Sequence, residues 1–245
     1  MGSGKYSALS GAVAREQAMA NIAANLANVT TTGFKRDRVS FASVLRGASQ
    51  IEAGRGINHT RIQQIAADFS QGGLQETGRP LDLAIDGEGF FKVRRGGETF
   101  YTRAGHLQID ENGLIKTSEG LNLVDAANQP LQLDTTTARE IVIAESGEIS
   151  VDGEVTDGRI QVVTVNDPKR LVKAGATLYR GGEGVTDQPL ETGRVIQGSL
   201  ETANVNMMEE MAAMIRTQRS FEVHHKAIES YSKLGDKLDE LGTLG

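Results

Sequence analysis

The chain has 245 residues, 38% of them hydrophobic and 24% charged, a composition typical of a protein with a buried core. Its net charge of -6 argues against a general binder of the nucleic-acid phosphate backbone, and we expect no nucleic-acid partner. The absence of cysteine excludes disulfides, thiolate metal sites and cysteine nucleophiles.

The start of the chain, MGSGKYSALSGA, has no cationic segment followed by an unbroken apolar run. Nowhere in the sequence does an apolar stretch approach the roughly 18 residues of a membrane-spanning helix. We therefore expect a protein that does not span a membrane and carries no cleaved signal peptide.

Residues 5–28 are predicted to form a helix that is apolar on more than one side. At 100° per residue its larger apolar residues fall on two nearly opposite sides, with alanines between them. The two sets are Tyr6, Leu9 and Val13, and Ile22, Leu26 and Val29. Such a helix is buried or packs against several partners, and the chain offers one obvious partner helix.

A narrow strip of uncharged polar residues completes this helix: Ser10, Gln17, Asn21, Asn25 and Asn28. Solvated helix surfaces usually carry Lys and Glu, whereas amides can pair across a packed interface without burying a charge. We therefore favour an interface role for the three asparagines over plain solvated surface. Four β-branched residues (29–32) precede Gly33 and are predicted to end the helix.

The middle of the chain changes character twice. Residues 35–80 are polar and weakly periodic, which predicts an extended arm. From Leu81 the period becomes two and turn signals separate short strands, which predicts a mainly antiparallel β domain over 81–195. The expected strands are 90–93, 98–103, 106–109, 114–117, 121–124, 130–133, 141–143, 148–151 and 159–165.

The C-terminal segment, 196–245, is predicted to be helical from Asn206, where Glu209 gives a capping-box-like start. Heptad spacing along this helix favours coiled-coil packing. The predicted seam is Met207, Met211, Met214, Gln218, Phe221, His225 and Ile228, continued by Tyr231, Leu234, Leu238 and Leu241. The expected fold class is α+β, with terminal helices forming a coiled-coil-like domain joined by the arm to the β domain.

The densest acidic stretch, LDLAIDGEGF (81–90), contains Asp82, Asp86 and Glu88. Two carboxylates about 5–9.5 Å apart could hydrolyse a glycosidic bond, so a cell-wall hydrolase using Asp86 and Glu88 is the alternative from another functional class. A strand edge followed by a turn is the simpler interpretation, because the chain offers no aromatic platform for a sugar. We expect no enzymatic activity and no small-molecule substrate.

The four histidines do not form a metal-binding pattern. His224 and His225 are adjacent and diverge by about 100° on a helix, so they cannot share a metal. The stretch DENG (110–113) opens like a calcium loop but lacks the glutamate at position twelve, and we predict a hairpin turn there. No phosphate-binding or dinucleotide-binding fingerprint occurs. We expect neither a metal nor a cofactor.

Three long blocks carry a family resemblance. They are ANLANVTTTGFKR (24–36), PLDLAIDGEGFFKV with YTRAGHLQIDENGLIKT (80–93 and 101–117), and VIQGSLETANVNMMEEMAAMIRTQRSFEVHHKAI (195–228). In this order they resemble the signatures of the flagellar axial proteins, the family of rod, hook and hook-associated subunits. The length and the start SGKYSALSGA are most similar to a proximal rod subunit, with a distal rod or hook-type subunit as the alternative.

The resemblance implies a structural subunit of the bacterial flagellar basal body. Such a subunit is exported through the flagellar type III apparatus without a cleaved signal peptide. It polymerises with copies of itself and other rod subunits into a hollow periplasmic rod that transmits torque and passes exported subunits. The implied domains are an axial helix and turn (1–34), the arm (35–80), an outer β domain (81–195) and a second axial helix (196–245).

We expect the assembly interface to lie on the two terminal helices, where apolar and amide residues exceed what one chain can cover. The predicted interface residues are Leu9, Val13, Asn21, Ile22, Asn25, Leu26, Asn28, Val29, Met207, Met211, Met214, Phe221, Ile228, Leu234 and Leu238.

Overall fold

The computed structural model describes residues 2–46, 57–125, 127–133, 140–190 and 193–242. The chain divides into two compact units, each assembled from separated stretches of sequence. The helical unit comprises Met1–Ala27, Asp37–Asp68 and Asn206–Gly245, and the β unit comprises Asn28–Arg36 and Phe69–Val205. Two terminal helices and a mainly antiparallel β domain between them are thus confirmed.

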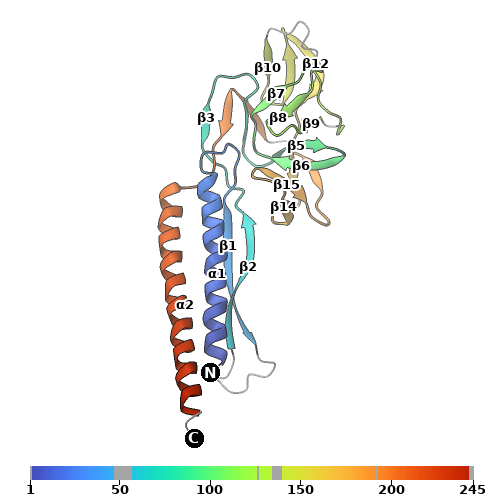
Figure 1. Ribbon diagram of the computed structural model, residues 1–245. Coiled ribbons are helices and arrows are strands. Elements are labelled where there is room, and N and C mark those ends of the chain that lie inside the picture. The colour runs from blue at the N-terminus through green and yellow to red at the C-terminus, as the bar shows by residue number, and fades with distance from the viewer. Residues whose placement is uncertain (1, 47–56, 126, 134–139, 191–192, 243–245) are drawn as a thin grey trace. The chain divides into compact units, whose positions relative to one another are not determined.

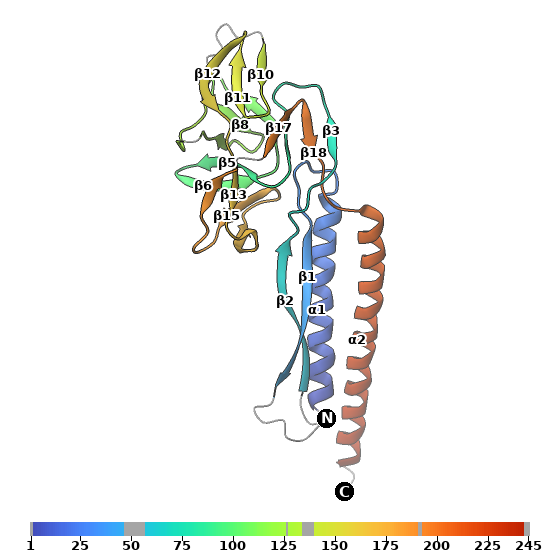
Figure 2. The ribbon, with the colours of Figure 1, turned by 180° about the vertical axis from the view of Figure 1, so that it is seen from behind.

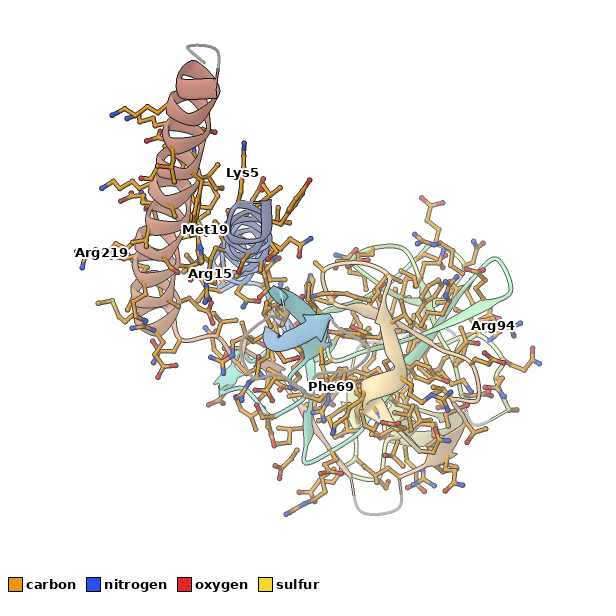
Figure 3. All side chains as sticks on the ribbon, turned by 90° about the horizontal axis from the view of Figure 1, so that it is seen from below. Lys5, Arg15, Met19, Phe69, Arg94 and Arg219 are labelled. Atoms are coloured by element: carbon orange, nitrogen blue, oxygen red, sulfur yellow. The ribbon has the colours of Figure 1, made fainter. Side chains whose placement is uncertain are left out.

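Helix α1 is the centre of the helical unit. Helices α1 (Gly2–Ala27) and α2 (Met207–Gly242) run antiparallel and side by side (Figures 1 and 2). Strands β1 (Asp37–Arg46) and β2 (Ile57–Ala67) pair as an antiparallel hairpin. Seen from below, α1 lies between α2 and this hairpin (Figure 3). The hairpin is a second intramolecular partner for α1, which the sequence analysis did not predict.

Two glycines allow α1 and α2 to approach closely. Gly4 and Gly11 lie seven residues apart, two helical turns, so they share one face of α1. A Cβ at Gly4 would lie 2.7 Å from Cζ of Tyr231, and a Cβ at Gly11 would lie 2.5 Å from Cε1 of His224. Two rings of α2 therefore occupy the space that side chains on α1 would need.

Helix α2 is more exposed than the predicted heptad seam implies. Among its described side chains only Glu210 is buried. Met214, Phe221 and Ile228 are partly buried, as expected for a seam. Met207, Met211 and Leu234 are exposed, because the contact strip passes through His224 and not His225; the side chain of Leu238 lies outside the described residues.

The amide of Asn25 has an intramolecular partner. Asn25 is buried, its Nδ2 donates to the carbonyl oxygen of Asp37 at 3.0 Å, and its Oδ1 accepts from the backbone N–H of Asp37 at 3.0 Å. One side chain thus satisfies both backbone groups at the start of β1, as a neighbouring strand would. Ile22 is also buried within its own subunit, so contacts of Asn25 and Ile22 with other subunits stay a prediction.

The chain turns immediately after α1. The backbone N–H of Thr31 donates to the carbonyl oxygen of Asn28 at 3.0 Å, and Gly33 has a φ of +71°. A Cβ at Gly33 would lie 2.3 Å from the backbone nitrogen of Ala104, so this position requires glycine on both conformational and steric grounds.

The range predicted as one extended arm, 35–80, is divided between the two units. Residues 37–68 belong to the helical unit, where they form β1 and β2 with a register shift between Ser40 and Phe41. Residues 69–80 belong to the β unit, where β3 (Leu74–Glu76) pairs with β18 (Ser199–Glu201). The hairpin escaped the sequence analysis because its pattern is polar and weakly periodic.

The β unit consists of short antiparallel strands (Figure 1). The largest sheet has the order β14-β15-β6-β5-β9-β8-β7, with β13 pairing β5 and β16; a second has the order β10-β11-β12, and β17 pairs β4. The strands are β4 (Leu83–Asp86), β5 (Phe90–Arg95), β6 (Glu98–Thr102), β7 (Leu107–Ile109), β8 (Ile115–Thr117), β9 (Asn122–Leu123), β10 (Ile141–Ile143), β11 (Glu148–Val151), β12 (Glu154–Arg159), β13 (Val162–Val165), β14 (Leu171–Lys173), β15 (Leu178–Gly181), β16 (Asp187–Pro189) and β17 (Arg194–Gln197). A short 3₁₀ helix, Pro168–Arg170, precedes β14.

One hydrophobic core holds the β unit together. Phe91, Leu121 and Ile149 are among its fully buried side chains and come from different parts of the chain. The predicted strand at 130–133 contributes Leu131 and Leu133 to the core but forms only isolated bridges. The predicted turn at 110–113 is confirmed, since Oδ1 of Asp110 accepts from the backbone N–H of Asn112 at 2.9 Å.

Replacing Gly11 by leucine should destabilise the pairing of α1 with α2, because even a Cβ there meets the His224 ring. Gly235→Ala is the matched control, since no atom lies within 4 Å of a Cβ at that site and alanine favours a helix by about 0.5–1 kcal/mol. Thermal melting followed by far-ultraviolet circular dichroism should show a lower midpoint for Gly11→Leu and a raised one for Gly235→Ala. Equal midpoints would contradict the close approach.

Candidate functional site

Three buried charged side chains meet in the β unit. Lys35 follows the turn after α1, Arg103 follows β6, and Glu201 ends β18. Their exposed fractions are 0%, 2% and 1%, so water screens none of them. Charged residues are almost never fully buried unless they are paired, and these three form one cluster.

Glu201 is the hub of this charge cluster. Its Oε1 accepts from Nζ of Lys35 at 2.6 Å and from the backbone N–H of Gly72 at 2.8 Å. Its Oε2 accepts from Nη1 of Arg103 at 3.2 Å. Each cation makes one further hydrogen bond to a backbone carbonyl oxygen. Nη2 of Arg103 donates to that of Gly87 at 2.8 Å, and Nζ of Lys35 donates to that of Ser70 at 2.7 Å.

The cluster places one carboxylate between two cations. Burial lowers the pKa of Arg103 below its ordinary value, and the charge and hydrogen bond of Glu201 act in the opposite direction. The guanidinium also lies over the ring of Phe90, at 5.5 Å from the ring centroid, which is a favourable place for a cation. Removing the carboxylate would therefore take away the negative charge that pairs with both buried cations.

Backbone hydrogen bonds reinforce the same junction. The N–H of Gly33 donates to the carbonyl oxygen of Glu201 at 2.7 Å, and the N–H of Arg36 donates to Oδ1 of Asn204 at 2.7 Å. Nδ2 of Asn204 donates to the carbonyl oxygen of Ser70 at 3.0 Å. The segment that follows α1 and the segment that precedes α2 are thus hydrogen-bonded to each other inside the β unit.

A second polar cluster involves one of the predicted acidic residues. Asp82 is 1% exposed, its Oδ1 lies 2.7 Å from Nδ1 of His106, and its Oδ2 accepts from Nε of Arg79 at 2.9 Å. Burial acts to raise the pKa of Asp82, but hydrogen bonds from His106, Thr77 and Arg79 together outweigh it and lower the pKa below its ordinary value. Asp82 therefore stays ionised and holds the 79–82 turn against His106.

Apolar side chains are exposed on both helices of the helical unit. On α1, Tyr6, Leu9 and Val13 are 63%, 48% and 43% exposed. On α2 the exposed apolar residues are Met207, Met208, Met211, Ile215, Val223, Tyr231 and Leu234. A protein that functions as a monomer rarely exposes contiguous apolar surface, which marks these faces as candidate interfaces.

The predicted interface residues differ in exposure: Ile22 and Asn25 are buried, the side chain of Leu238 lies outside the described residues, and the others form two groups. Leu9, Val13, Met207, Met211 and Leu234 are exposed and available to a partner. Asn21, Leu26, Asn28, Val29, Met214, Phe221 and Ile228 are partly buried. Met208 and Ile215 are absent from the predicted interface residues because they lie outside the predicted heptad seam, although Met208 belongs to a methionine-rich stretch that is typical of adaptable binding surfaces.

Comparison with known proteins gives three family matches. Residues 6–35 match the flagella basal body rod protein family, residues 84–151 the flagellar hook protein FlgE/F/G D1 domain, and residues 196–241 the flagellar basal body rod FlgEFG protein C-terminal family. The chain belongs to the flagellar basal-body rod protein family. The first and last matches contain nearly all of α1 and α2, and the middle one begins in β4 and ends with β11.

Alignments with individual relatives cover almost the whole of this chain. The flagellar basal-body rod protein FlgG of Bacillus subtilis is 33% identical over 258 residues, with 96% of this chain and 97% of that protein covered. FlgG of Buchnera aphidicola is 33% identical over 248 residues, covering 90% and 92%. The flagellar basal-body rod protein FlgF of Caulobacter vibrioides is 30% identical over 225 residues, covering 91% of each chain.

This rod-family membership identifies a structural protein, not an enzyme, and nothing supports the hydrolase. Oδ2 of Asp86 lies 3.9 Å from Nη2 of Arg194 at the surface, and Glu88 is exposed. Among the described residues, no group of three His, Asp or Glu side chains is placed to hold a metal ion. In that same part of the chain, neither helix has an apolar stretch long enough to cross a membrane.

Glu201→Gln should destabilise the β unit by about 3–5 kcal/mol, because the isosteric amide removes the buried carboxylate that pairs with both Lys35 and Arg103. Asp86→Asn, which loses only the exposed pair with Arg194, should cost about 0–1 kcal/mol. Urea unfolding followed by tyrosine fluorescence measures both, since Tyr101 and Tyr179 are buried in the β unit. A Glu201→Gln cost as small as the control would show that the cluster is not stabilising.

Asp82 should contribute a pH-dependent part of stability. Because its pKa in the folded protein lies below the ordinary 3.8, its contribution is fully present above that value and is lost as pH falls through the lower folded value. The difference in unfolding free energy between the unmodified protein and Asp82→Asn should be constant above about pH 5 and shrink below 3.8. A difference that stays constant down to pH 2.5 would contradict this assignment.

Proposed function

We propose that this protein is a structural subunit of the bacterial flagellar basal-body rod. It polymerises through its helical unit into a hollow helical shaft that transmits torque and passes exported subunits. Family membership supports the location in the basal body, and the exposed apolar faces of α1 and α2 support polymerisation. Its partners are copies of itself and other rod subunits.

The observation that carries this proposal is the incomplete coverage of α1. Within one chain, α2 and the β1–β2 hairpin cover two sides of this helix, while Tyr6, Leu9 and Val13 stay exposed. These side chains are 63%, 48% and 43% exposed, so about half of the ~1.5–3 kcal/mol that full burial of a large apolar side chain contributes is still missing. Contacts with neighbouring subunits would recover that free energy.

We propose that α1 and α2 act as a coiled-coil-like pair in the rod and that the β unit forms its outer layer. The seven-residue spacing of Gly4 and Gly11 and their contacts with Tyr231 and His224 support the helix pairing. The separate hydrophobic core of the β unit supports an outer layer that folds by itself.

Among rod subunits we propose the proximal rod, as in FlgF. Identity does not separate the two candidates, at 33% against 30%. The FlgF alignment has 225 positions for about 223 residues of this chain, which is 91% of 245. The two FlgG alignments have 258 and 248 positions for about 235 and 220 residues, so FlgG has stretches without a counterpart here.

Proximal placement makes the position of the subunit testable. Electron microscopy of purified basal bodies with a tag on this chain should show label at the inner-membrane end of the rod. Label at the outer end would assign the chain to the distal rod. The resemblance also supports a periplasmic location reached through the type III export apparatus without a cleaved signal peptide, and these remain parts of the proposal.

Val13→Asp should abolish incorporation into the rod, because the aspartate would place a carboxylate in the packed interface that the exposed Val13 is proposed to form. Val155→Asp is the matched control, since Val155 is 72% exposed in the β unit. Immunoblots of purified basal bodies and swarming in soft agar measure incorporation and motility.

Both variants should fold, since neither residue is buried in the free chain. The proposal predicts loss of incorporation and motility for Val13→Asp and retention of both for Val155→Asp. Normal motility and incorporation with Val13→Asp would show that this helix face is not an interface.

A further inference from the structure

We infer that one copy of this chain docks the exposed face of its α1 against the exposed N-terminal part of α2 on the next copy, shifted by about 22 Å along the helices. The two faces are the α1 stripe, formed by Tyr6, Leu9 and Val13, and the α2 stripe, formed by Met208, Met211 and Ile215. This inference rests on the proposed function and specifies which surfaces join and in what register.

The two stripes match each other in spacing and chemistry. Each consists of three apolar residues at positions i, i+3 and i+7, which places them along one line of a helix. The side chains of the α2 stripe are 73%, 48% and 52% exposed, close to the 63%, 48% and 43% of the α1 stripe. Neither stripe contains a charged residue, so packing one on the other buries no unpaired charge.

The register of α1 and α2 within one copy fixes where each stripe lies. Gly4 faces Tyr231 and Gly11 faces His224, so residues at the same height have numbers that sum to 235. Leu9 is therefore level with Lys226, while Met211 is level with Ala24, fifteen residues further along α1. At 1.5 Å per residue, the stripe centres are separated by about 22 Å.

This separation prevents one copy from satisfying its own stripes. The α1 stripe lies near the N-terminal end of α1, and the α2 stripe lies near the N-terminal end of α2, which is the opposite end of the antiparallel pair. Docking the α1 stripe of one copy on the α2 stripe of another leaves one free stripe on each. Such a heterologous contact can repeat without closing, which produces a filament.

The matched stripes favour a second copy as the occupant. A partner of different structure would cover only one of the two stripes, and the exposure of the other stripe would then have no explanation. A second copy explains both stripes at once, and α1 then runs antiparallel to the neighbour's α2 when all copies point the same way. In that arrangement Leu9 lies opposite Met211, and Tyr6 and Val13 lie opposite Ile215 and Met208.

Disulfide trapping tests the contact, because the chain contains no cysteine of its own. A disulfide requires Cα atoms within about 7 Å, so Leu9→Cys and Met211→Cys in one chain cannot join within a copy across about 22 Å. Cells producing this double variant, which must first be shown to incorporate it into basal bodies, are oxidised and analysed by non-reducing electrophoresis. The expected product is a ladder of covalent multimers.

Two further samples make the result specific. Co-production of Leu9→Cys on one chain and Met211→Cys on another should give dimers and no ladder, and neither single variant alone should give dimers. The control pair is Leu9→Cys with Val223→Cys, since Val223 is also exposed on α2 and is level with Ala12, within the length of the α1 stripe. It should give no multimers.

Each remaining outcome overturns the inference. Multimers cross-linked through Leu9→Cys and Val223→Cys would show contact without the 22 Å shift, and dimers from Leu9→Cys alone would show a symmetric contact. Bands containing a different rod subunit would show that the occupant is not a second copy. If the variant is incorporated but no multimers form, the docking is wrong while the proposed function stands; if the unmodified chain is itself absent from basal bodies, the proposed function fails.

Discussion

Helix α1 has more apolar and close-packing surface than its own chain covers, and the rest of the structure depends on this constraint. Its two glycines accept the rings of Tyr231 and His224 from α2. A second side packs against the β1–β2 hairpin, and Asn25 joins the helix to the start of β1. The third side carries Tyr6, Leu9 and Val13 in water. A helix satisfied on two sides holds its shape while keeping a defined surface for neighbours.

The buried charge cluster solves a different problem. Charged groups in a dry interior contribute to specificity only when every partner is present, because each unpaired member is costly. Lys35 and Glu201 are 166 positions apart and flank the two terminal helices in sequence. Their pairing inside the β unit means that the charge cluster is complete only when the segment after α1 and the segment before α2 have come together.

The features that could be predicted from sequence were those with a local signal, either a periodic spacing of apolar residues or a group of turn residues. The terminal helices, the β-rich middle and the turn at 110–113 follow from spacings of three to four, of two, and from turn residues. The paired strands β1 and β2 were missed because their sequence is only weakly periodic and because their packing against α1 is a tertiary contact that local spacing does not reveal. The charge cluster left no local signal either, since lysine, arginine and glutamate are ordinary surface residues until distant segments meet. The α2 seam was misplaced in part because glycines on α1, not apolar side chains, decide which residues of α2 make the contact.

The two units also differ in how they use side-chain size. The β unit has a core of large aliphatic and aromatic residues and needs no other subunit to bury them. The helical unit places small residues at its internal contact and leaves several larger ones, such as Leu9 and Met211, at its surface. Small residues bring the helices close but bury little apolar surface of their own, so the exposed apolar side chains of this unit are not covered within one copy. In the proposed rod, neighbouring subunits cover the side chains that folding alone leaves exposed.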